Sequence, residues 1–297
     1  MKNFAYLPAP YFSHFENITN SKKDTVKTQP NEKKNTLLSL FDEIRTKYKY
    51  YEDNFDKGKL HLINSTGYID IKKLSLLDAY TGNGKELDKL KSSIKKLQHQ
   101  DWQNTCPYCG ILSLNSTDHY LPKEDYSEYA VLAINLVPCC LECNNKKGTY
   151  WKVNNARTII NFYLDDIPEQ EFLTCDLKYE DAIPVARYNL SQAHGISAES
   201  FNLIECHYDR LDLLERYKDG SNDEITSTLD SILSFSKDDE PSKIKSDLIT
   251  NYQKRVSRYG VNHWRCALLK ALYNSNEFLD QASSALKVQL VNDMLKI

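Results

Sequence analysis

Apolar residues recur at helical spacing through the last third of the chain. From Ser197 onward, intervals of three and four residues place them on one side of successive helices. The four stripes are Phe201, Ile204, Tyr208, Leu211 and Leu214; Ile225, Leu229, Ile232 and Leu233; Ile244, Leu248, Tyr252 and Val256; and Trp264, Leu268, Ala271 and Leu272. Breaks at Asp219-Gly220 and around Pro241 are predicted to separate the helices. We therefore expect residues 197–297 to form a C-terminal helical region that packs as a bundle.

The first hundred residues show the same spacing, interrupted by one polar stretch. Residues 20–35 are charged and almost free of large apolar side chains, which predicts a flexible surface loop. Two helical stripes follow it: Leu37, Leu40, Phe41, Ile44 and Tyr48, and later Leu87, Leu90, Ile94 and Leu97. We expect residues 1–100 to be mostly helical, with the polar loop at about 20–35. Residues 161–196 have a mixed pattern and are expected to be a connecting region.

The predicted helix from Lys85 to His99 carries an excess of positive charge. It contains five lysines, at positions 85, 89, 91, 95 and 96, but only two acidic residues, Glu86 and Asp88. Such a face is typical of a helix exposed to solvent. It would equally suit contact with a phosphate backbone beside an active site. Both interpretations stay open at this point.

Composition and charge limit the kind of protein this can be. Of 297 residues, 41% are hydrophobic and 27% charged, as in ordinary globular proteins, and the formal net charge is -3. A chain that is not basic would bind nucleic acid only through a local patch or with the help of a partner. No apolar run approaches the roughly 18 residues of a membrane span. The N-terminus lacks the layout of a signal peptide, so we expect a cytoplasmic protein without membrane contact.

Eight cysteines in a reducing compartment indicate metal ligands and buried thiols rather than disulfides. Cys106 and Cys109 form one C-x-x-C pair, and Cys140 and Cys143 form a second. Two such pairs complete a tetrahedral four-sulfur Zn²⁺ site. Cys139 is an alternative to Cys140 as the third ligand, although Cys140 repeats the spacing of the first pair. About thirty residues separate the pairs, so a substantial segment is inserted into the zinc clamp.

The inserted segment carries residues suited to metal-assisted hydrolysis. Short strands are predicted around Asp118 and at 135–138, followed by a helix that starts near Cys143. Asp118 and Asn144 offer the oxygen ligands that Mg²⁺ or Mn²⁺ prefers. His119 can accept a proton from water near neutral pH. Positive charge for a phosphodiester backbone would come from Lys123, Lys146 and Lys147.

The ordered motifs C-x-x-C, D-H-x-x-P, N-L-V-P and C-x-x-C-N-x-x-K resemble the HNH (ββα-metal) endonuclease superfamily, over roughly residues 106–148. The resemblance implies that His119 is the general base, that Asp118 and Asn144 hold the catalytic divalent ion, and that Asn135 orients the imidazole. The four cysteines would bind structural zinc. Many members have histidine where this chain has Asn144, which implies weaker metal binding; Asn145 is a neighbouring alternative.

The wider layout is similar to HNH proteins that accompany an ATPase in bacterial anti-phage systems of the Septu and retron-associated kinds. The cues are the stretches "NTCPYCG", "DHYLPK", "NLVPCCLECNNKKG" and "DRLDLLERY". The resemblance implies a partner ATPase bound through the helical regions. The expected fold is mainly α, α+β in class, with a small zinc-stapled ββα-metal module at residues 101–160.

Two alternatives remain open from the sequence. The cysteine region could be a non-catalytic zinc module that binds nucleic acid or a partner protein, which would not need Asp118, His119 and Asn144 at their positions. The region 197–297 could be a docking domain or simply a stabilising one. The substrate is expected to be DNA, but nothing in the sequence separates DNA from RNA.

Overall fold

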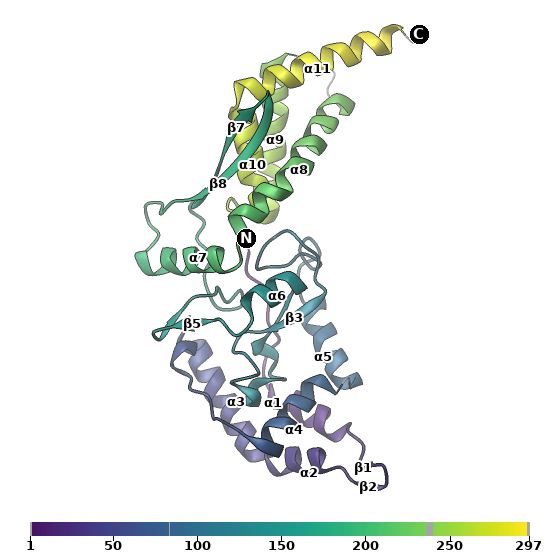
Figure 1. The fold of residues 1–297 in the computed structure, drawn as a ribbon, viewed down its shortest axis with the longest axis vertical. Helices are drawn as coiled ribbons and strands as arrows, with labels where there is room; N and C mark the ends of the chain where they lie inside the picture. The colour runs from purple at the N-terminus through teal and green to yellow at the C-terminus, as the bar shows by residue number, and fades with distance from the viewer. Residues whose placement is uncertain (1, 83, 236–239, 296–297) are drawn as a thin grey trace. The chain divides into compact units, whose positions relative to one another are not determined.

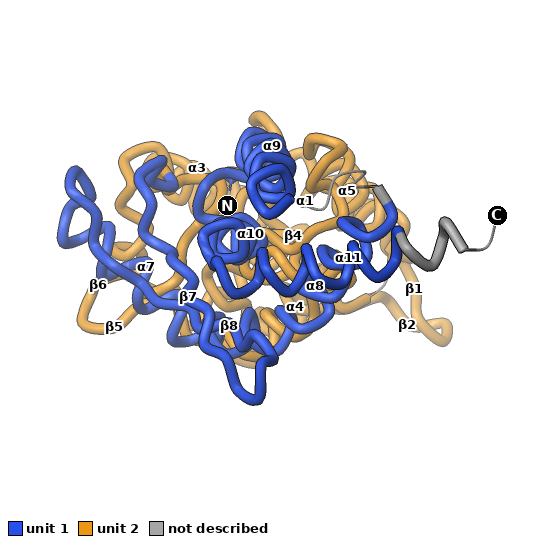
Figure 2. The backbone as a smooth tube through the Cα atoms, turned by 90° about the horizontal axis from the view of Figure 1, so that it is seen from above, with its two compact units in different colours: residues 1–2, 167–297 blue, residues 3–166 orange. Residues whose placement is uncertain are grey.

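The computed structural model describes residues 2–82, 84–235 and 240–295. Asn83, in the centre of the predicted Gly82-Asn83-Gly84 break, lies outside them. The chain divides into two compact units, unit 2 at residues 3–166 and unit 1 at residues 1–2 and 167–297 (Figure 2). About 54% of the chain is helical and the sheets are small and antiparallel, so the expected α+β class is confirmed.

Unit 2 consists of short helices packed around small β-hairpins (Figure 1). Its elements are α1 (Phe12–Asn20), β1 (Thr25–Val26), β2 (Gln29–Pro30), α2 (Glu32–Ser39), α3 (Phe41–Asp56), α4 (Asp70–Thr81), α5 (Lys85–Lys96), β3 (Ser116–His119), β4 (Leu136–Cys139), α6 (Leu141–Lys147), β5 (Lys152–Val153) and β6 (Ala156–Arg157), with 3₁₀ turns at Leu60–Leu62, Ser127–Tyr129 and Ala133–Asn135. Its helical core is aromatic: Phe15, Tyr48 and Tyr51 are buried. This core supports the segment that holds the two cysteine pairs.

Helix α5 shows how local sequence produces an element of unit 2. Leu87, Leu90 and Ile94 lie on one side and are buried. Acidic residues occupy the first turn and Lys95 and Lys96 the last, which complements the helix dipole at both ends. One side of α5 is therefore fixed by packing, and its lysines lie elsewhere on its surface.

The polar stretch at 20–35 is shorter and more structured than predicted. The structure ends α1 at Asn20 and begins α2 at Glu32, with the two-residue strands β1 and β2 between them. Lys34 is buried, and its ammonium donates to the carbonyls of Asn20 and Lys22 and to the carboxylate of Asp24. One lysine thus closes the loop by binding three oxygen atoms that the polar sequence supplies.

The described part of unit 1 combines a β-hairpin with five helices. Figure 1 shows β7 (Leu173–Glu180) and β8 (Ile183–Leu190), followed by α7 (Ala198–Arg210), α8 (Leu213–Phe235), α9 (Pro241–Tyr259), α10 (Trp264–Asn274) and α11 (Asn276–Leu295). The hairpin packs on α8 through β8 and on α10 through β7. Asn262 ties the start of the hairpin to the loop before α10, because its side chain accepts from the amides of Phe172 and Leu173 and donates to two carbonyls upstream.

One predicted helix break is wrong and one is right. Helix α8 runs unbroken through Asp219 and Gly220, and the chain turns instead at Asp212, whose φ is 54°. A Cβ at Gly220 would lie 3.5 Å from the ring of Trp264, so the glycine allows that ring to approach the helix closely. Pro241 does begin a helix, at the first position of α9, where its missing N–H costs nothing.

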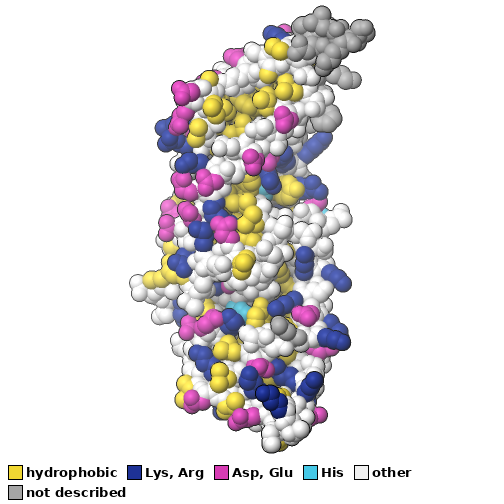
Figure 3. Space-filling model, turned by 45° about the vertical axis from the view of Figure 1, so that its right-hand side comes forward, with side chains coloured by type: hydrophobic (Ala, Val, Ile, Leu, Met, Phe, Trp, Pro, Cys, Tyr) yellow, Lys and Arg dark blue, Asp and Glu magenta, His cyan; other side chains and the backbone are white. Residues whose placement is uncertain are grey.

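Among the described residues, no helix is both long and apolar enough to cross a membrane. Figure 3 shows Lys and Arg side chains interspersed with Asp and Glu on the face that it draws. On this face, binding of a polyanion would therefore depend on local groups rather than on a broad field of one sign.

Candidate zinc centre and active site

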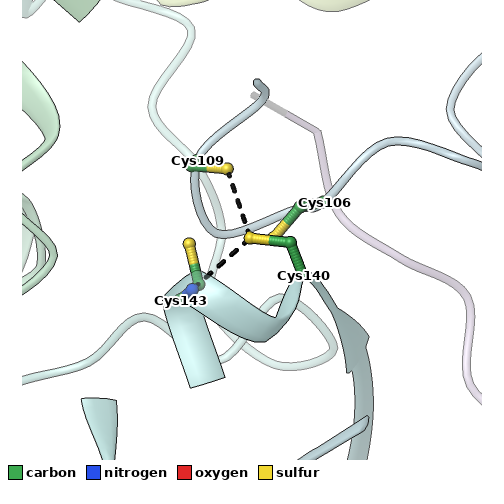
Figure 4. A group of neighbouring side chains, drawn as sticks. All are labelled: Cys106, Cys109, Cys140 and Cys143. Carbon is green, nitrogen blue, oxygen red and sulfur yellow. Dashed lines mark hydrogen bonds between the residues drawn. The ribbon is translucent and has the colours of Figure 1, made fainter. Parts of the chain in front are cut away.

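The two cysteine pairs meet in one buried cluster. The sulfur atoms of Cys106, Cys109, Cys140 and Cys143 lie within 4.8 Å of one another, and Cys109 and Cys140 are 3.9 Å apart (Figure 4). A tetrahedral ion with Zn–S bonds of about 2.3 Å requires sulfur atoms about 3.8 Å apart. The cluster therefore fits a zinc ion, and Cys140 rather than Cys139 belongs to it and would be the third ligand.

Backbone turns hold the sulfur atoms in place. Gly110 donates its amide to the carbonyl of Cys106 at 2.8 Å and has φ 65°, a left-handed conformation suited to glycine. The amide of Ile111 donates to the sulfur of Cys109, and the amide of Cys143 donates to that of Cys140, both at 3.4 Å. Such N–H donors stabilise thiolates, so each pair is built as an anionic ligand.

The electrostatics of the four thiols also favour a bound cation. Burial raises the pKa of the Cys106 thiol well above its usual range. Hydrogen bonds from Cys106 and the neighbouring thiols lower the pKa of Cys140. Four buried thiolates this close would repel one another strongly. A divalent cation would offset that repulsion and allow four deprotonated sulfur atoms to share one site.

We expect the purified protein to carry one zinc ion per chain. Cys140→Ala should lose the ion and much of the stability of unit 2, because metal binding contributes folding free energy. The matched control is Cys139→Ala, its buried neighbour on β4, which should retain zinc. Elemental analysis of the two variants gives the answer; zinc loss in the Cys139 variant alone would contradict this ligand set.

Strands β3 and β4 and helix α6 follow one another around the cluster. The strands pair antiparallel, Ser116 opposite Cys139 and His119 opposite Leu136. Asp118 and His119 lie on β3 and are 2% and 6% exposed. Asn144 lies on α6, where its side-chain nitrogen donates to the hydroxyl of Ser116 at 2.8 Å and approaches the carbonyl of Thr117 at 3.5 Å. The structure thus fastens Asn144 to the strand that carries Asp118 and His119.

His119 is a neutral, oriented imidazole. Its Nε2 lies 2.9 Å from the carbonyl oxygen of Ala130, which can only accept, so Nε2 carries the hydrogen and Nδ1 has the free lone pair. The ring of Tyr80 meets it edge to face at 4.3 Å between centroids. Burial lowers the pKa of His119 to about 3, assisted by the charges of Lys123 and Lys147 and opposed by the Ala130 carbonyl. In this state the imidazole is therefore a weaker base than the sequence predicted for proton transfer near neutral pH.

Asn135 does not orient His119, contrary to the prediction. It is fully buried, and its side-chain oxygen accepts from the amide of Leu121 at 2.8 Å and from the hydroxyl of Tyr51 at 3.1 Å. Its nitrogen donates to the carbonyls of Leu121 and Tyr129 at 3.1 Å each. The amide therefore closes the loop between β3 and β4, and a backbone carbonyl holds the imidazole instead.

Asp118 is the acceptor of a buried network. One carboxylate oxygen accepts from the hydroxyl of Tyr108 at 2.7 Å, and the other accepts from the ammonium of Lys147 at 2.9 Å. Lys147 is fully buried and also donates to the carbonyl of His119 at 2.8 Å. The phosphate contact predicted for Lys147 is therefore wrong, because its ammonium points into the protein and neutralises Asp118.

These contacts determine what could hold a catalytic ion. A divalent ion on Asp118 would be repelled by the ammonium of Lys147, which already binds that carboxylate. Asn144 is half-buried, and among the described residues its side-chain oxygen accepts no hydrogen bond. The fit to the predicted pair of ligands is thus incomplete: one amide oxygen is open, and further ligands would come from water or a substrate phosphate, as Mg²⁺ commonly has.

The remaining predicted residues lie nearer to solvent. Lys123 is half-buried, pairs with Glu124 at 2.5 Å and is close enough to His119 to affect its pKa. Lys146 is half-buried in the last turn of α6. Sequence reasoning missed Tyr80, which contacts the imidazole from the end of α4, about forty residues before the strand; no local pattern around Tyr80 signals that contact.

The comparisons with known proteins give one partial match. Protein ea31 of Escherichia phage lambda is 27% identical over 142 residues, which make up 44% of this chain and 48% of that protein. The chain thus matches about half the length of this curated relative. No protein-family model matches the chain. No solved structure matches it either.

Removing one partner of the buried pair should destabilise the protein. Lys147→Met leaves the Asp118 carboxylate without its cation, and we expect a loss of about 3–5 kcal/mol in the free energy of unfolding. Urea denaturation measures this loss. Lys146→Met, one position earlier, should cost less than about 1 kcal/mol as a surface change. Equal effects of the two substitutions would argue against a structural role for the buried ammonium.

The lowered pKa of His119 should make stability sensitive to acid. The unfolded state binds a proton near pH 6.5, whereas the folded state resists protonation down to about pH 3. The contribution is complete above pH 6.5 and is lost as the pH falls from there towards 3. His119→Gln should therefore reduce the drop in Tm between pH 7 and pH 5, whereas His194→Gln, an exposed control in unit 1, should leave it unchanged. An unchanged drop in the His119 variant would mean that the imidazole titrates normally.

Proposed function

We propose that this protein is a metal-dependent endonuclease of the HNH type, which hydrolyses phosphodiester bonds of DNA. The observation that carries the proposal is the fastening of Asn144, on α6, to the strand that bears His119, through the hydroxyl of Ser116 and the carbonyl of Thr117. Two antiparallel strands followed by a helix, with a four-thiol cluster at its start, support the ββα-metal resemblance. A proton acceptor and an open amide oxygen then lie on adjoining elements.

Each residue has a definite part in the proposed reaction. Nδ1 of His119 takes the proton from the attacking water, while the Ala130 carbonyl fixes the ring through Nε2. Asn144 would hold the divalent ion together with oxygen atoms of the substrate phosphate. When bound, such an ion supplies positive charge for the extra negative charge of the transition state. Lys123 and Lys146 remain as contacts for the neighbouring phosphates, and Lys147 is no longer among them.

The proposal extends to a biological setting. We infer that the nuclease acts as the effector of a bacterial anti-phage system together with an ATPase. All candidate site residues come from unit 2, so the helices of unit 1 are available to bind a partner. The similarity of part of the chain to a phage lambda protein supports a setting in bacteria and their phages.

The decisive test of the nuclease is a cleavage assay. With Mg²⁺ or Mn²⁺ present, we expect the purified protein to cut plasmid DNA. His119→Ala should lower the rate about 10²- to 10⁴-fold, the range for loss of a general base. His194→Ala, an exposed histidine of unit 1, serves as the matched control and should retain the wild-type rate. Undiminished cleavage by the His119 variant would remove that residue from the mechanism.

One set of observations favours a second candidate, a non-catalytic zinc module that binds nucleic acid or a protein. His119 is only 6% exposed, and the Asp118 carboxylate is occupied by Lys147. Both would be expected if these side chains stabilised the fold instead of acting on a substrate. Binding of DNA without cleavage, under any divalent ion tested, would favour this candidate over the nuclease.

A further inference from the structure

The ring of Tyr80 connects the proposed catalytic base to helix α5. The Tyr80 ring packs edge to face against the His119 imidazole, with 4.3 Å between the two ring centroids. The ammonium of Lys91 lies 4.1 Å from the centroid of the same ring. The Tyr80 hydroxyl points towards the carbonyl of Thr117 at 3.5 Å, the same carbonyl that Asn144 approaches. Tyr80 and Lys91 therefore belong to the surroundings of the candidate site, although they come from residues well before it in sequence.

Lys91 is a cation without a carboxylate partner. It is half-buried, and among the described residues no Asp or Glu lies within ion-pair distance of its ammonium. Burial lowers the pKa of Lys91, and the charge of Asp88, one turn earlier on α5, opposes that effect without forming an ion pair. The face of a tyrosine stabilises an ammonium by about 0.5–2 kcal/mol but leaves it without a charge-assisted hydrogen bond to an anion. Lys91 thus retains the capacity to bind an anion.

We propose that Lys91 binds a backbone phosphate of the nucleic acid next to the phosphate that His119 addresses. This inference rests on the proposed nuclease function. The two distances through Tyr80 limit the separation of ammonium and imidazole to about 8 Å, and a duplex strand advances about 3.4 Å per phosphate. Successive phosphates lie further apart than this axial advance, because the strand winds around the axis. An upper limit of about 8 Å therefore allows contact with the scissile phosphate and its immediate neighbour. Tyr80 fixes the spacing, because its ring contacts both groups.

The other lysines of α5 divide between two environments. Lys95 follows Lys91 by one turn, on the same side of the helix, and is also half-buried. By contrast, Lys85, Lys89 and Lys96 are exposed on the side away from the buried leucines, and Lys89 pairs with Glu86 at 2.6 Å. Most of the lysines of α5 are therefore exposed to solvent, and the proposed phosphate contact lies on the one side of the helix that carries Lys91.

A binding experiment tests the role of Lys91 separately from cleavage. Fluorescence anisotropy would measure the Kd of a labelled DNA duplex, without added divalent ions, between 50 and 200 mM salt. Lys91→Met keeps the aliphatic stem and removes the charge, so we expect affinity to fall about three- to tenfold and the slope of log Kd against log salt to decrease by about 1. Lys96→Met, an equal loss of charge on the exposed side of α5, should change the slope by much less.

Further variants separate a phosphate contact from a structural role. Lys91→Arg should restore binding because it restores the charge. Tyr80→Phe should bind as the wild type does. Tyr80→Leu removes the ring beneath the ammonium but keeps the charge, so it should bind more weakly than the wild type and less weakly than Lys91→Met. Circular dichroism and zinc content confirm that each variant is folded. The same assay with single-stranded DNA and RNA shows which backbone is preferred.

The results distinguish this inference from the nuclease proposal. Weakened binding and a smaller slope for Lys91→Met alone support the phosphate contact, whether or not the protein cleaves DNA. If Lys91→Met and Lys96→Met both bind as the wild type does, the phosphate contact is refuted, and a wild type that cleaves DNA keeps the nuclease. A wild type that binds none of the three nucleic acids also refutes it.

Discussion

The segment from Cys106 to Cys143 depends on bringing four buried sulfur atoms together. Thiols from two turns, separated by about thirty residues, lie within 4.8 Å of one another. Without a cation, burial opposes their deprotonation and their charges oppose one another. With zinc, the same four atoms close a loop whose ends could otherwise separate. The cluster also marks the start of α6, because Cys140 caps that helix through its sulfur, and so sets where Asn144 lies.

Strand β3 places Asp118 and His119 in different surroundings. Successive side chains of a strand point to opposite faces, and Asp118 and His119 follow this rule. Asp118 joins a hydrogen-bonded network with Tyr108 and Lys147, all of it buried. His119 instead meets Tyr80 and the carbonyl of Ala130. An adjacent pair of residues thus combines a group that stabilises the protein with a group that can accept a proton.

Much of the local structure could be predicted from the sequence, but the contacts of the site could not. Spacing alone identified the four cysteines. Periodicity identified helical sequence throughout unit 1, but it gave no separate stripe for α11 and placed the break between α7 and α8 at Asp219-Gly220 instead of Asp212. The break predicted at Gly220 was wrong because the sequence does not distinguish a glycine that ends a helix from one that lets a tryptophan ring pack closely against it. Lys147 was misread because a lysine three positions after Asn144 is expected to be exposed until the position of β3 is known. Tyr80 was missed because its contact with His119 arises from tertiary packing.

Helix α6 has only seven residues, yet its rotation about its own axis is fixed. Cys143 and Lys147 are four residues apart, on one side of the helix, and both are fully buried. A thiol cluster holds the first and an ion pair holds the second. Asn144 follows Cys143 by one position, so its direction is set by two anchors that lie outside the proposed catalytic ion site. The Asn144 amide is preorganised, so binding a ligand through its oxygen would cost the side chain little conformational entropy.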